Sequence, residues 1–450
     1  GLAANYTLSG GTHQLTVNQR PLNATLARQY DGTTTAAGSD LSSFDALQGG
    51  ETLTMTGSGT AASANVANGI AMSSNGTLAL ADGTGLASNY SLNSTVINIA
   101  QRVLNSSGSK TYDANTDALA GAITLSNLVS GEALNHSGTA TISSANAGSY
   151  TITNLSGISI ADGSGGTASN YTLTGGTHNF TVNRRAVSVS GTRLYDATTN
   201  AVASDLSTHA NLVGSETLNL SGTGTIASKN VGSNKTVSVG TLALADGSNG
   251  GLAANYTLSG GTHQLTVNKA PISLTGSRQY DGTQDVRNSD FSLSGLQGGE
   301  DLTTSGLGSV VSKNVGNGKT VDTSGLTLEN GQTGTAGLAS NYTFSGGTQT
   351  FNITERVLNM SASRDYNTLK TVSSGIITLS NLVGSETLAL SGDGSVSDEN
   401  VGTNKTIGVD TLSLADGANG GIASNYTLAG GTHLLTINKA VISITGTRQY

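Results

Sequence analysis

The chain alternates apolar and polar residues in short runs that end at turn residues. In the segment 216–226, Leu218 and Leu220 alternate with polar neighbours, a Gly-containing turn follows, and alternation resumes at Ile226. A period of two over a few residues, bounded by Gly, Asn, Asp or Ser, is typical of short antiparallel strands joined by hairpins. No long stretch has a helical period, and the best helical candidate, 39–47, amounts to one turn or none.

The sequence repeats itself about every 84 residues, and three positions recur in each copy. A basic–x–Tyr motif places its tyrosine 82 to 86 residues after the previous one, and an Asn-Tyr-Thr/Ser motif lies before the next copy. A glutamate follows the first tyrosine by 20 or 21 residues. The first-motif tyrosines are Tyr30, Tyr112, Tyr195, Tyr280 and Tyr366, the second-motif tyrosines are Tyr6, Tyr90, Tyr171, Tyr256, Tyr342 and Tyr426, and the glutamates are Glu51, Glu132, Glu216, Glu300 and Glu386. These residues form the predicted structural motif of each repeat.

The boundaries between repeats fall after the strand that ends in Val-Asn or Ile-Asn. They give repeat 1 (19–100), repeat 2 (101–183), repeat 3 (184–268), repeat 4 (269–354) and repeat 5 (355–438). Residues 1–18 match the C-terminal end of a preceding repeat, and 439–450 match the start of a following one, so we expect the chain to be part of a longer array. Linkers are almost absent, so neighbouring repeats are expected to abut and to form an elongated, stiff rod.

Each repeat predicts a small Ig-like antiparallel β-sandwich of about 84 residues, in which seven or eight strands fit. Two alternatives stay open, namely β-grasp-like units and one continuous β-helix. A β-helix would show coils of roughly 20–30 residues. No such shorter period is visible, which favours separate all-β domains.

Composition excludes several functions. The 450 residues contain no Cys, which excludes disulfides and Cys-based metal sites. The net charge is −8 and the 20 basic residues are scattered, which argues against nucleic acid as a partner. No apolar run is long enough to span a membrane. No nucleophile, base and acid gather in one motif, so we do not expect an enzyme.

The basic–x–Tyr–Asp motif has a structural and a functional interpretation. In the structural one the ring packs at the edge of the sandwich, the hydroxyl bonds to backbone, Asp makes an Asx turn, and Arg pairs with a carboxylate such as the recurrent glutamate. In the functional one the repeated tyrosines form a glycan-binding surface. Asn-Tyr-Thr also matches the N-glycosylation acceptor pattern.

Two other repeated features could hold a metal. Asp-Gly loops, which are rich in oxygen, raise calcium as the one cofactor to consider, but each loop has a single carboxylate and turn chemistry alone explains it. Four histidines share one repeat position and lie too far apart to converge if each repeat folds alone. The loops begin at Asp82, Asp162, Asp246 and Asp416, and the histidines are His13, His178, His263 and His433.

The motif set resembles the bacterial YDG repeat. The resemblance rests on Tyr30-Asp31-Gly32-Thr33 and Tyr280-Asp281-Gly282-Thr283, on Lys229-Asn230-Val231-Gly232, and on the Asn-Tyr-Thr-Leu motif, and it covers essentially the whole chain. Such repeats occur in tandem in very large secreted or surface proteins, often beside filamentous-haemagglutinin-like modules. The resemblance therefore implies an extracellular, Gram-negative cell-surface location, export in an unfolded state, and a stalk or adhesin role.

We accordingly expect a structural stalk or filament of a bacterial adhesin or matrix protein. Its expected partners are the neighbouring repeats, and beyond them other copies in a fibre, glycans or a host surface. Two alternatives remain: a repeated glycan-binding module, and a subunit of a laterally assembled extracellular fibre.

Overall fold

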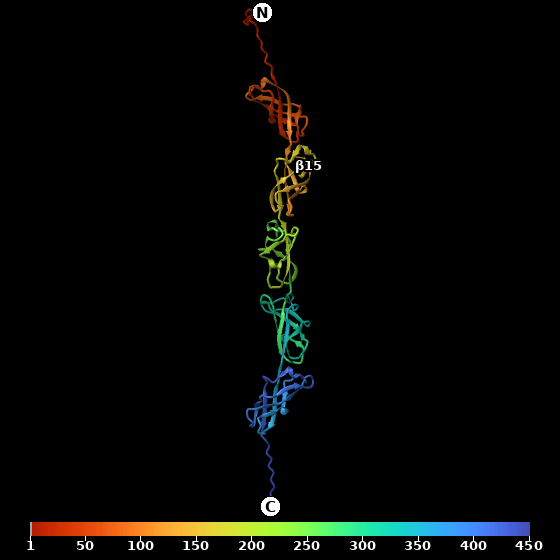
Figure 1. Ribbon diagram of the computed structural model, residues 1–450, viewed down its shortest axis with the longest axis vertical. Coiled ribbons are helices and arrows are strands. Elements are labelled where there is room, and N and C mark those ends of the chain that lie inside the picture. The colour runs from red at the N-terminus through yellow and green to blue at the C-terminus, as the bar shows by residue number, and fades with distance from the viewer. Residues whose placement is uncertain (1) are drawn as a thin grey trace. The chain divides into compact units, whose positions relative to one another are not determined.

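The computed structural model describes residues 2–450 and is built of strands and single 3-10 turns (Figure 1). The predicted all-β class is confirmed. The chain divides into two compact units. The first contains the residues up to Ser188 with 209–219 and 244–261, and the second contains 189–208, 220–243 and 262–450. Repeats 1 and 2 thus lie in the first unit, repeats 4 and 5 lie in the second, and repeat 3 contributes one end to each.

Repeat 1 shows the plan of a single domain. Its main sheet has the strand order β2-β5-β6-β8-β1-β3, and a separate two-stranded sheet pairs β4 with β7. The strands are β1 (Arg20–Gln29), β2 (Thr35–Ala37), β3 (Leu41–Phe44), β4 (Leu53–Thr56), β5 (Ser58–Ala61), β6 (Ala67–Ser74), β7 (Ala79–Asp82) and β8 (Tyr90–Ala100).

Repeat 2, also in the first unit, has the order β11-β13-β14-β17-β10-β12, and β15 pairs with β13. Its strands are β9 (Arg102–Val103), β10 (Asn105–Thr111), β11 (Asp117–Leu119), β12 (Ile123–Ser126), β13 (Leu134–Ile142), β14 (Gly148–Asn154), β15 (Ile158–Asp162), β16 (Tyr171–Thr172) and β17 (His178–Asn183). A short parallel pair, β9–β16, stands where repeat 1 continues its long strands β1 and β8.

Repeats 3 and 4 follow the same plan. In repeat 3 the order is β20-β23-β24-β27-β19, and in repeat 4 it is β30-β33-β34-β37-β29-β31 with the pair β32–β35. The strands of repeat 3 are β18 (Arg185–Ala186), β19 (Ser188–Leu194), β20 (Asn200–Val202), β21 (Thr208–Ala210), β22 (Leu218–Ser221), β23 (Thr223–Ile226), β24 (Gly232–Ser238), β25 (Ala243–Asp246), β26 (Tyr256–Thr257) and β27 (Gln264–Asn268). Those of repeat 4 are β28 (Ala270–Pro271), β29 (Ser273–Gln279), β30 (Asp285–Val286), β31 (Phe291–Ser294), β32 (Leu302–Gly306), β33 (Gly308–Val310), β34 (Gly316–Asp322), β35 (Leu326–Asn330), β36 (Tyr342–Thr343) and β37 (Gln349–Thr354).

Repeat 5 has the order β41-β39-β47-β44, with the pairs β40–β43 and β42–β45. Its strands are β38 (Arg356–Val357), β39 (Asn359–Asp365), β40 (Thr371–Ser373), β41 (Ile377–Ser380), β42 (Leu388–Ser391), β43 (Asp393–Ser395), β44 (Gly402–Thr406), β45 (Ser413–Asp416), β46 (Tyr426–Thr427) and β47 (His433–Asn438).

Two kinds of 3-10 turn recur in the domains. One precedes each Asn-Tyr-Thr/Ser tyrosine, and the other follows the short strand that comes after each basic–x–Tyr motif, namely β2, β11, β20, β30 or β40. The turns are η1 (Ala3–Asn5), η2 (Gly38–Asp40), η3 (Ala87–Asn89), η4 (Ala120–Ala122), η5 (Ala168–Asn170), η6 (Ala203–Asp205), η7 (Ala253–Asn255), η8 (Asn288–Asp290), η9 (Ala339–Asn341), η10 (Ser374–Ile376) and η11 (Ala423–Asn425). The helical candidate 39–47 is therefore one 3-10 turn followed by strand β3.

The first and last long strands of every repeat pair in parallel, which differs from the purely antiparallel sandwich that the sequence predicts. In repeat 4, β29 and β37 run side by side from Leu274↔Gln349 to Gln279↔Thr354. Apolar alternation reveals a strand and its buried face but not the direction of its neighbour. As a consequence, the chain enters a domain at one end and leaves it at the opposite end.

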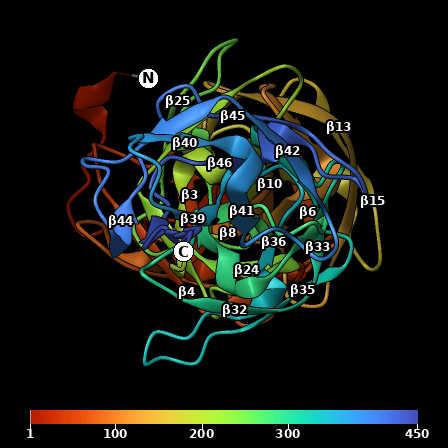
Figure 2. The ribbon, with the colours of Figure 1, turned by 90° about the horizontal axis from the view of Figure 1, so that it is seen from below.

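The core of a domain lies between the main sheet and the two-stranded sheet. In repeat 4, Leu274, Val310 and Phe351 of the main sheet share one buried cluster with Leu326 of β35. Figure 2 shows β32 and β35 side by side. The turn that connects β32 to β33 requires glycine, because Gly306 has a φ of 84° and a Cβ there would lie 2.2 Å from the Gly325 carbonyl oxygen. The same cluster continues through repeat 5.

Candidate functional site at the repeat junctions

Tyr30 directly follows the last residue of β1, and its side chain extends out of repeat 1. The Tyr30 amide donates to the Ala100 carbonyl over 2.9 Å, which ties it to the end of the parallel strand β8. Asp31 makes the expected Asx turn by accepting the Thr33 amide at 2.9 Å, and Arg28 pairs with Asp31. The predicted pairing of this arginine with the recurrent glutamate is therefore wrong.

The carboxylate of Glu132 joins two tyrosines from consecutive repeats. Tyr30 of repeat 1 donates its hydroxyl to Oε1 of Glu132 over 2.6 Å, and Tyr171 of repeat 2 donates to Oε2 over 2.6 Å. The two rings meet edge to face, with centroids 5.4 Å apart and planes at 78°. The Tyr171 hydroxyl also accepts the Val129 amide at 3.1 Å. We call this Tyr–Glu–Tyr arrangement the junction triad.

The junction triad occurs at four junctions with closely similar geometry. Each has two hydroxyl–carboxylate hydrogen bonds of 2.5–2.7 Å and an edge-to-face ring contact of 5.4–5.5 Å. The triads are Tyr30–Glu132–Tyr171, Tyr112–Glu216–Tyr256, Tyr195–Glu300–Tyr342 and Tyr280–Glu386–Tyr426. The first two lie within the first unit and the other two within the second.

An asparagine side chain makes a second connection at each junction. Asn170 of repeat 2 is only 1% exposed. Its Oδ1 accepts the Val66 amide of repeat 1 at 2.9 Å, and its Nδ2 donates to Oδ1 of Asn65 over 3.0 Å. We call this the asparagine latch. The equivalent contacts join Asn255 to Asn146 and Ala147, Asn341 to Asn230 and Val231, and Asn425 to Asn314 and Val315.

The junctions differ in whether a lysine accompanies the glutamate. Lys229 Nζ lies 2.6 Å from Oε1 of Glu300 and 5.9 Å from the centre of the Tyr195 ring. Lys313 is placed similarly, 3.6 Å from Oε1 of Glu386. In repeats 1 and 2 the corresponding position is alanine. Glu300 and Glu386 are buried, whereas the glutamates of the first two triads are half-buried.

The environment of the triads shifts their proton affinities. Burial, and then the hydrogen bond to Glu132, raises the pKa of Tyr171 to about 12. Burial opposes ionisation of Glu300, but the hydrogen bonds from Lys229, Tyr195 and Tyr342 outweigh it and lower the pKa of this carboxyl. Burial also raises the pKa of Tyr195 and Tyr342, so the Glu300 triad at neutral pH is two neutral phenols on one carboxylate.

The sequence-predicted motif residues outside the four triads have other surroundings. Tyr90 donates to Glu51 within repeat 1. Tyr366, which directly follows β39 in repeat 5, is 39% exposed, and Tyr6 is 78% exposed. The basic–x–Tyr tyrosine of each triad donates its hydroxyl to a carboxylate of the next repeat, not to backbone as the sequence suggested. Because the triad tyrosines are buried, they cannot serve as the exposed stacking surface of a glycan-binding module.

The Asp-Gly loops and the repeated histidines have structural partners. Asp162 Oδ1 accepts the Ala168 amide at 2.7 Å and so holds the turn that precedes Tyr171. His178 bonds through Nε2 to the Leu173 carbonyl at 2.7 Å and through Nδ1 to the Ser106 hydroxyl at 2.9 Å. Within residues 2–450, no three His, Asp or Glu side chains are grouped to hold a metal ion. No helix in this part of the chain has the length and apolarity to cross a membrane.

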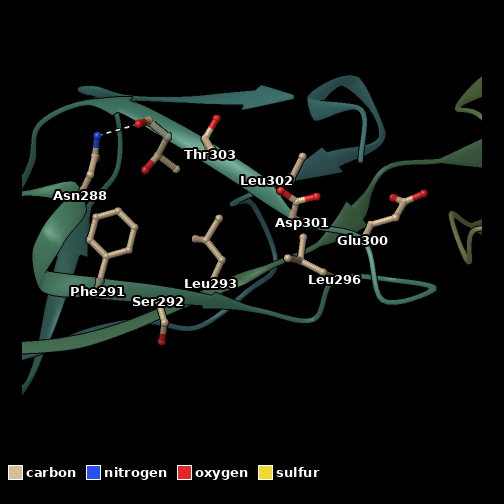
Figure 3. A pocket seen from close by; sticks show the side chains of 10 residues that line it. Asn288, Phe291, Ser292, Leu293, Leu296, Glu300, Asp301, Leu302 and Thr303 are labelled. Carbon is tan, nitrogen blue, oxygen red and sulfur yellow. Dashed lines mark hydrogen bonds between the residues drawn. The ribbon is translucent and has the colours of Figure 1, made fainter. Parts of the chain in front are cut away.

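A groove of about 440 Å³ lies between β31 and β32 in repeat 4 (Figure 3). Phe291, Leu293 and Leu302 line it, and Ser292 points away from it. The side-chain Nδ2 of Asn288 donates to the Thr304 carbonyl over 2.6 Å at one end. Its lining combines Phe291, Leu293, Leu296 and Leu302 with polar side chains that include Glu300 and Asp301.

Comparisons with known proteins identify the repeats. The family model of the YDG domain matches the chain five times, over residues 11–97, 100–179, 179–264, 262–350 and 354–433. No curated protein sequence matches the chain. Among solved structures, the crystal structure of Drosophila N-cadherin EC1-4 is similar at 9% identity over 94% of this chain and 100% of that chain, with a TM-score of 0.11, which carries no argument about fold.

Proposed function

Because the chain belongs to the YDG domain family and carries five copies of that domain in tandem, we propose that it is the structural stalk or filament of a large bacterial cell-surface adhesin or biofilm matrix protein. In this role the repeats provide length and stiffness and perform no catalysis. The partners that matter are the neighbouring repeats of the same chain.

The observation that carries the proposal is the junction triad. A hydrogen bond to a charged group contributes about 1.5–3 kcal/mol, and an aromatic pair adds about 0.5–1.5 kcal/mol beyond its buried area. Each junction combines two such hydrogen bonds, one ring pair and an asparagine latch. Contacts of this kind resist rotation of one repeat against the next, which a stalk needs and a flexible string of domains does not.

An extracellular location is supported by the family resemblance and by chemistry. The chain has no cysteine, so its folding and its export do not depend on a disulfide-forming compartment. The interactions that join the repeats are tyrosine–carboxylate and amide hydrogen bonds, which form without any thiol or disulfide. This combination suits a protein that is secreted unfolded and folds outside the cell.

Electron microscopy of the 450-residue chain tests the proposal. From the strand rise, five domains of roughly 30–40 Å each give an expected length of about 150–200 Å, with little bending. A variant in which Tyr30, Tyr112, Tyr195 and Tyr280 are all changed to Phe should bend more and show a broader range of end-to-end distances. Tyr6→Phe together with Tyr150→Phe is the matched control, since neither residue belongs to a triad.

Two results would contradict the stalk. If the wild-type chain is as flexible as the fourfold variant, the triads do not stiffen the array. If micrographs show ordered lateral bundles in place of single rods, the chain is a fibre subunit.

A further inference from the structure

The two phenol groups of each junction triad converge on one carboxylate. Tyr30 binds Oε1 of Glu132 and Tyr171 binds Oε2, and the rings are in edge-to-face contact at 5.4 Å. Since both acceptor atoms belong to one carboxylate, the two phenol oxygens and the ring carbons beside them are held close together. All four junctions repeat this arrangement, in which the ring planes meet at 77–79°.

We propose that each junction triad is a site of oxidative dityrosine formation, a covalent bond between ortho carbons of the two rings that links consecutive repeats. The co-reactant is an oxidant of the peroxidase and hydrogen peroxide class. The inference concerns the chemistry of the junctions and stands whether or not the array serves as a stalk.

The step balances with one peroxide for each link. Each phenol gives one electron to the oxidant and its hydroxyl proton to the glutamate carboxylate, which passes the proton to solvent. The two phenoxyl radicals join at their ortho carbons, and the hydrogen on each of these carbons moves to its phenol oxygen as the ring regains aromaticity. Two tyrosines and one hydrogen peroxide thus give one dityrosine and two waters.

Glu132 is placed to act as the proton acceptor. A phenol gives up an electron more readily when its proton can move to a base at the same time, and a base within hydrogen-bond reach meets the geometric condition for that transfer. The carboxylate contacts both hydroxyls at 2.6 Å. The product also suits the site, because ortho-linked phenols place their two hydroxyls side by side, as the carboxylate requires.

Burial protects the radicals from other reactions. Tyr171 is 1% exposed and Tyr30 is 5% exposed, so a radical on either ring meets its partner ring before it meets another molecule. The chain has no cysteine that could scavenge the radical or link the repeats by a disulfide. The neighbouring ring is therefore the favoured reaction partner.

The lysines predict a difference between junctions. Lys229 binds the same carboxylate oxygen of Glu300 that accepts the Tyr195 hydroxyl. A carboxylate that already carries a cation is a weaker proton acceptor. We therefore expect the link to form faster at the triads of Glu132 and Glu216 than at those of Glu300 and Glu386.

The test treats the whole 450-residue chain with a haem peroxidase and hydrogen peroxide, then digests it and sequences linked peptides by mass spectrometry. The expected product joins the peptides of Tyr30 and Tyr171, is lighter than their sum by two hydrogen atoms, and has dityrosine fluorescence. Tyr171→Phe should abolish this product and leave the Tyr112–Tyr256 product unchanged. Glu132→Gln, which keeps the size of the side chain and one of its two acceptor oxygens but removes the base, should slow the first link several-fold relative to the second.

Tyr90 is the internal control, because it binds Glu51 but pairs with no second tyrosine ring among residues 2–450. If Tyr90 or the exposed Tyr6 is found in links as often as the triad tyrosines, the arrangement gives no preference and the proposal fails. It also fails if Tyr6 and Tyr366 are oxidised while no triad peptides are linked. An unchanged rate in Glu132→Gln would overturn the role of the carboxylate.

Discussion

Removing the hydroxyl of Tyr30 perturbs one junction selectively. Tyr30→Phe removes its hydrogen bond to Glu132 and leaves the ring in contact with Tyr171. A hydrogen bond to a charged group contributes about 1.5–3 kcal/mol. Glu132 keeps its bond from Tyr171 and is only half-buried, so we take the lower part of that range. A loss of about 1.5–2 kcal/mol should favour opening of this junction roughly 10- to 30-fold.

Four backbone amides report on the four junctions separately. The Val66 amide donates to Asn170 across the first junction, and its exchange with deuterium requires that this latch opens. The corresponding amides at the other junctions belong to Ala147, Val231 and Val315. In native-state hydrogen exchange followed by NMR, Tyr30→Phe should accelerate Val66 by about 10- to 30-fold and leave the other three amides unchanged.

Two outcomes would refute this reasoning. An unchanged Val66 rate would mean that the hydroxyl–carboxylate bond does not hold the junction closed. Equal acceleration of all four amides would mean that the substitution destabilises the fold and not one junction. Tyr150→Phe, a substitution on β14 opposite Phe180, serves as the control for a general effect of losing one phenol hydroxyl.

Three further changes are expected. Lys229→Ala removes an ion pair whose lysine side chain is 42% exposed, so the third junction should weaken by no more than about 1 kcal/mol, and the effect on Val231 exchange should shrink in high salt. Gly306→Ala places a Cβ against a backbone carbonyl at positive φ and should lower the urea midpoint, with a cost of roughly 1–3 kcal/mol. Gly121→Ala is the matched control, because its Cβ meets no atom within 4 Å and its φ is not positive, so it should change the stability by less than about 1 kcal/mol. Alkaline pH should also destabilise the folded chain. A tyrosine whose pKa in the folded state lies above the unfolded value of 10.0 contributes stability that is complete below pH 10 and is lost as the pH rises towards 12. Tyrosinate absorbance and circular dichroism should report that loss together. The tyrosines whose pKa is raised to about 12 are Tyr112, Tyr171, Tyr256, Tyr280 and Tyr426. If these triad tyrosines ionise near pH 10 without unfolding, the triads do not hold their protons.

The sequence predicts the local structure well and the junctions poorly, for a physical reason. Apolar alternation and Gly-rich turns indicate the strands, and the Asx turn at Asp31 follows from the local sequence Asp31-Gly32. The partner of Tyr30 cannot be read in the same way, because one glutamate, Glu51, lies 21 residues on in the same repeat and another, Glu132, lies 102 residues on in the next. Since all repeats carry the same motif, the sequence pattern is identical for a pairing within a repeat and for one between repeats.

The parallel pairing of these strands cannot be predicted from the sequence, for a related reason. A strand with one buried face has the same alternation whichever way its neighbour runs, so Leu274 and Phe351 indicate burial but not direction. The recurrent Asn-Tyr-Thr motif did contain a signal that could have indicated the junction contacts. Its asparagine recurs with its tyrosine in every copy, although a strand start alone requires neither side chain.

The parallel pairing of β1 with β8 has a mechanical consequence. The chain enters repeat 1 where β1 begins and leaves it where β8 ends, and the two strands are paired from Arg20↔Tyr90 to Gln29↔Ala100. A force that pulls the two ends of the domain apart therefore slides one strand along the other. All the hydrogen bonds between them bear the load together, whereas strands pulled from the same end peel apart one bond at a time. A chain of such domains can transmit tension between its ends while each domain stays folded.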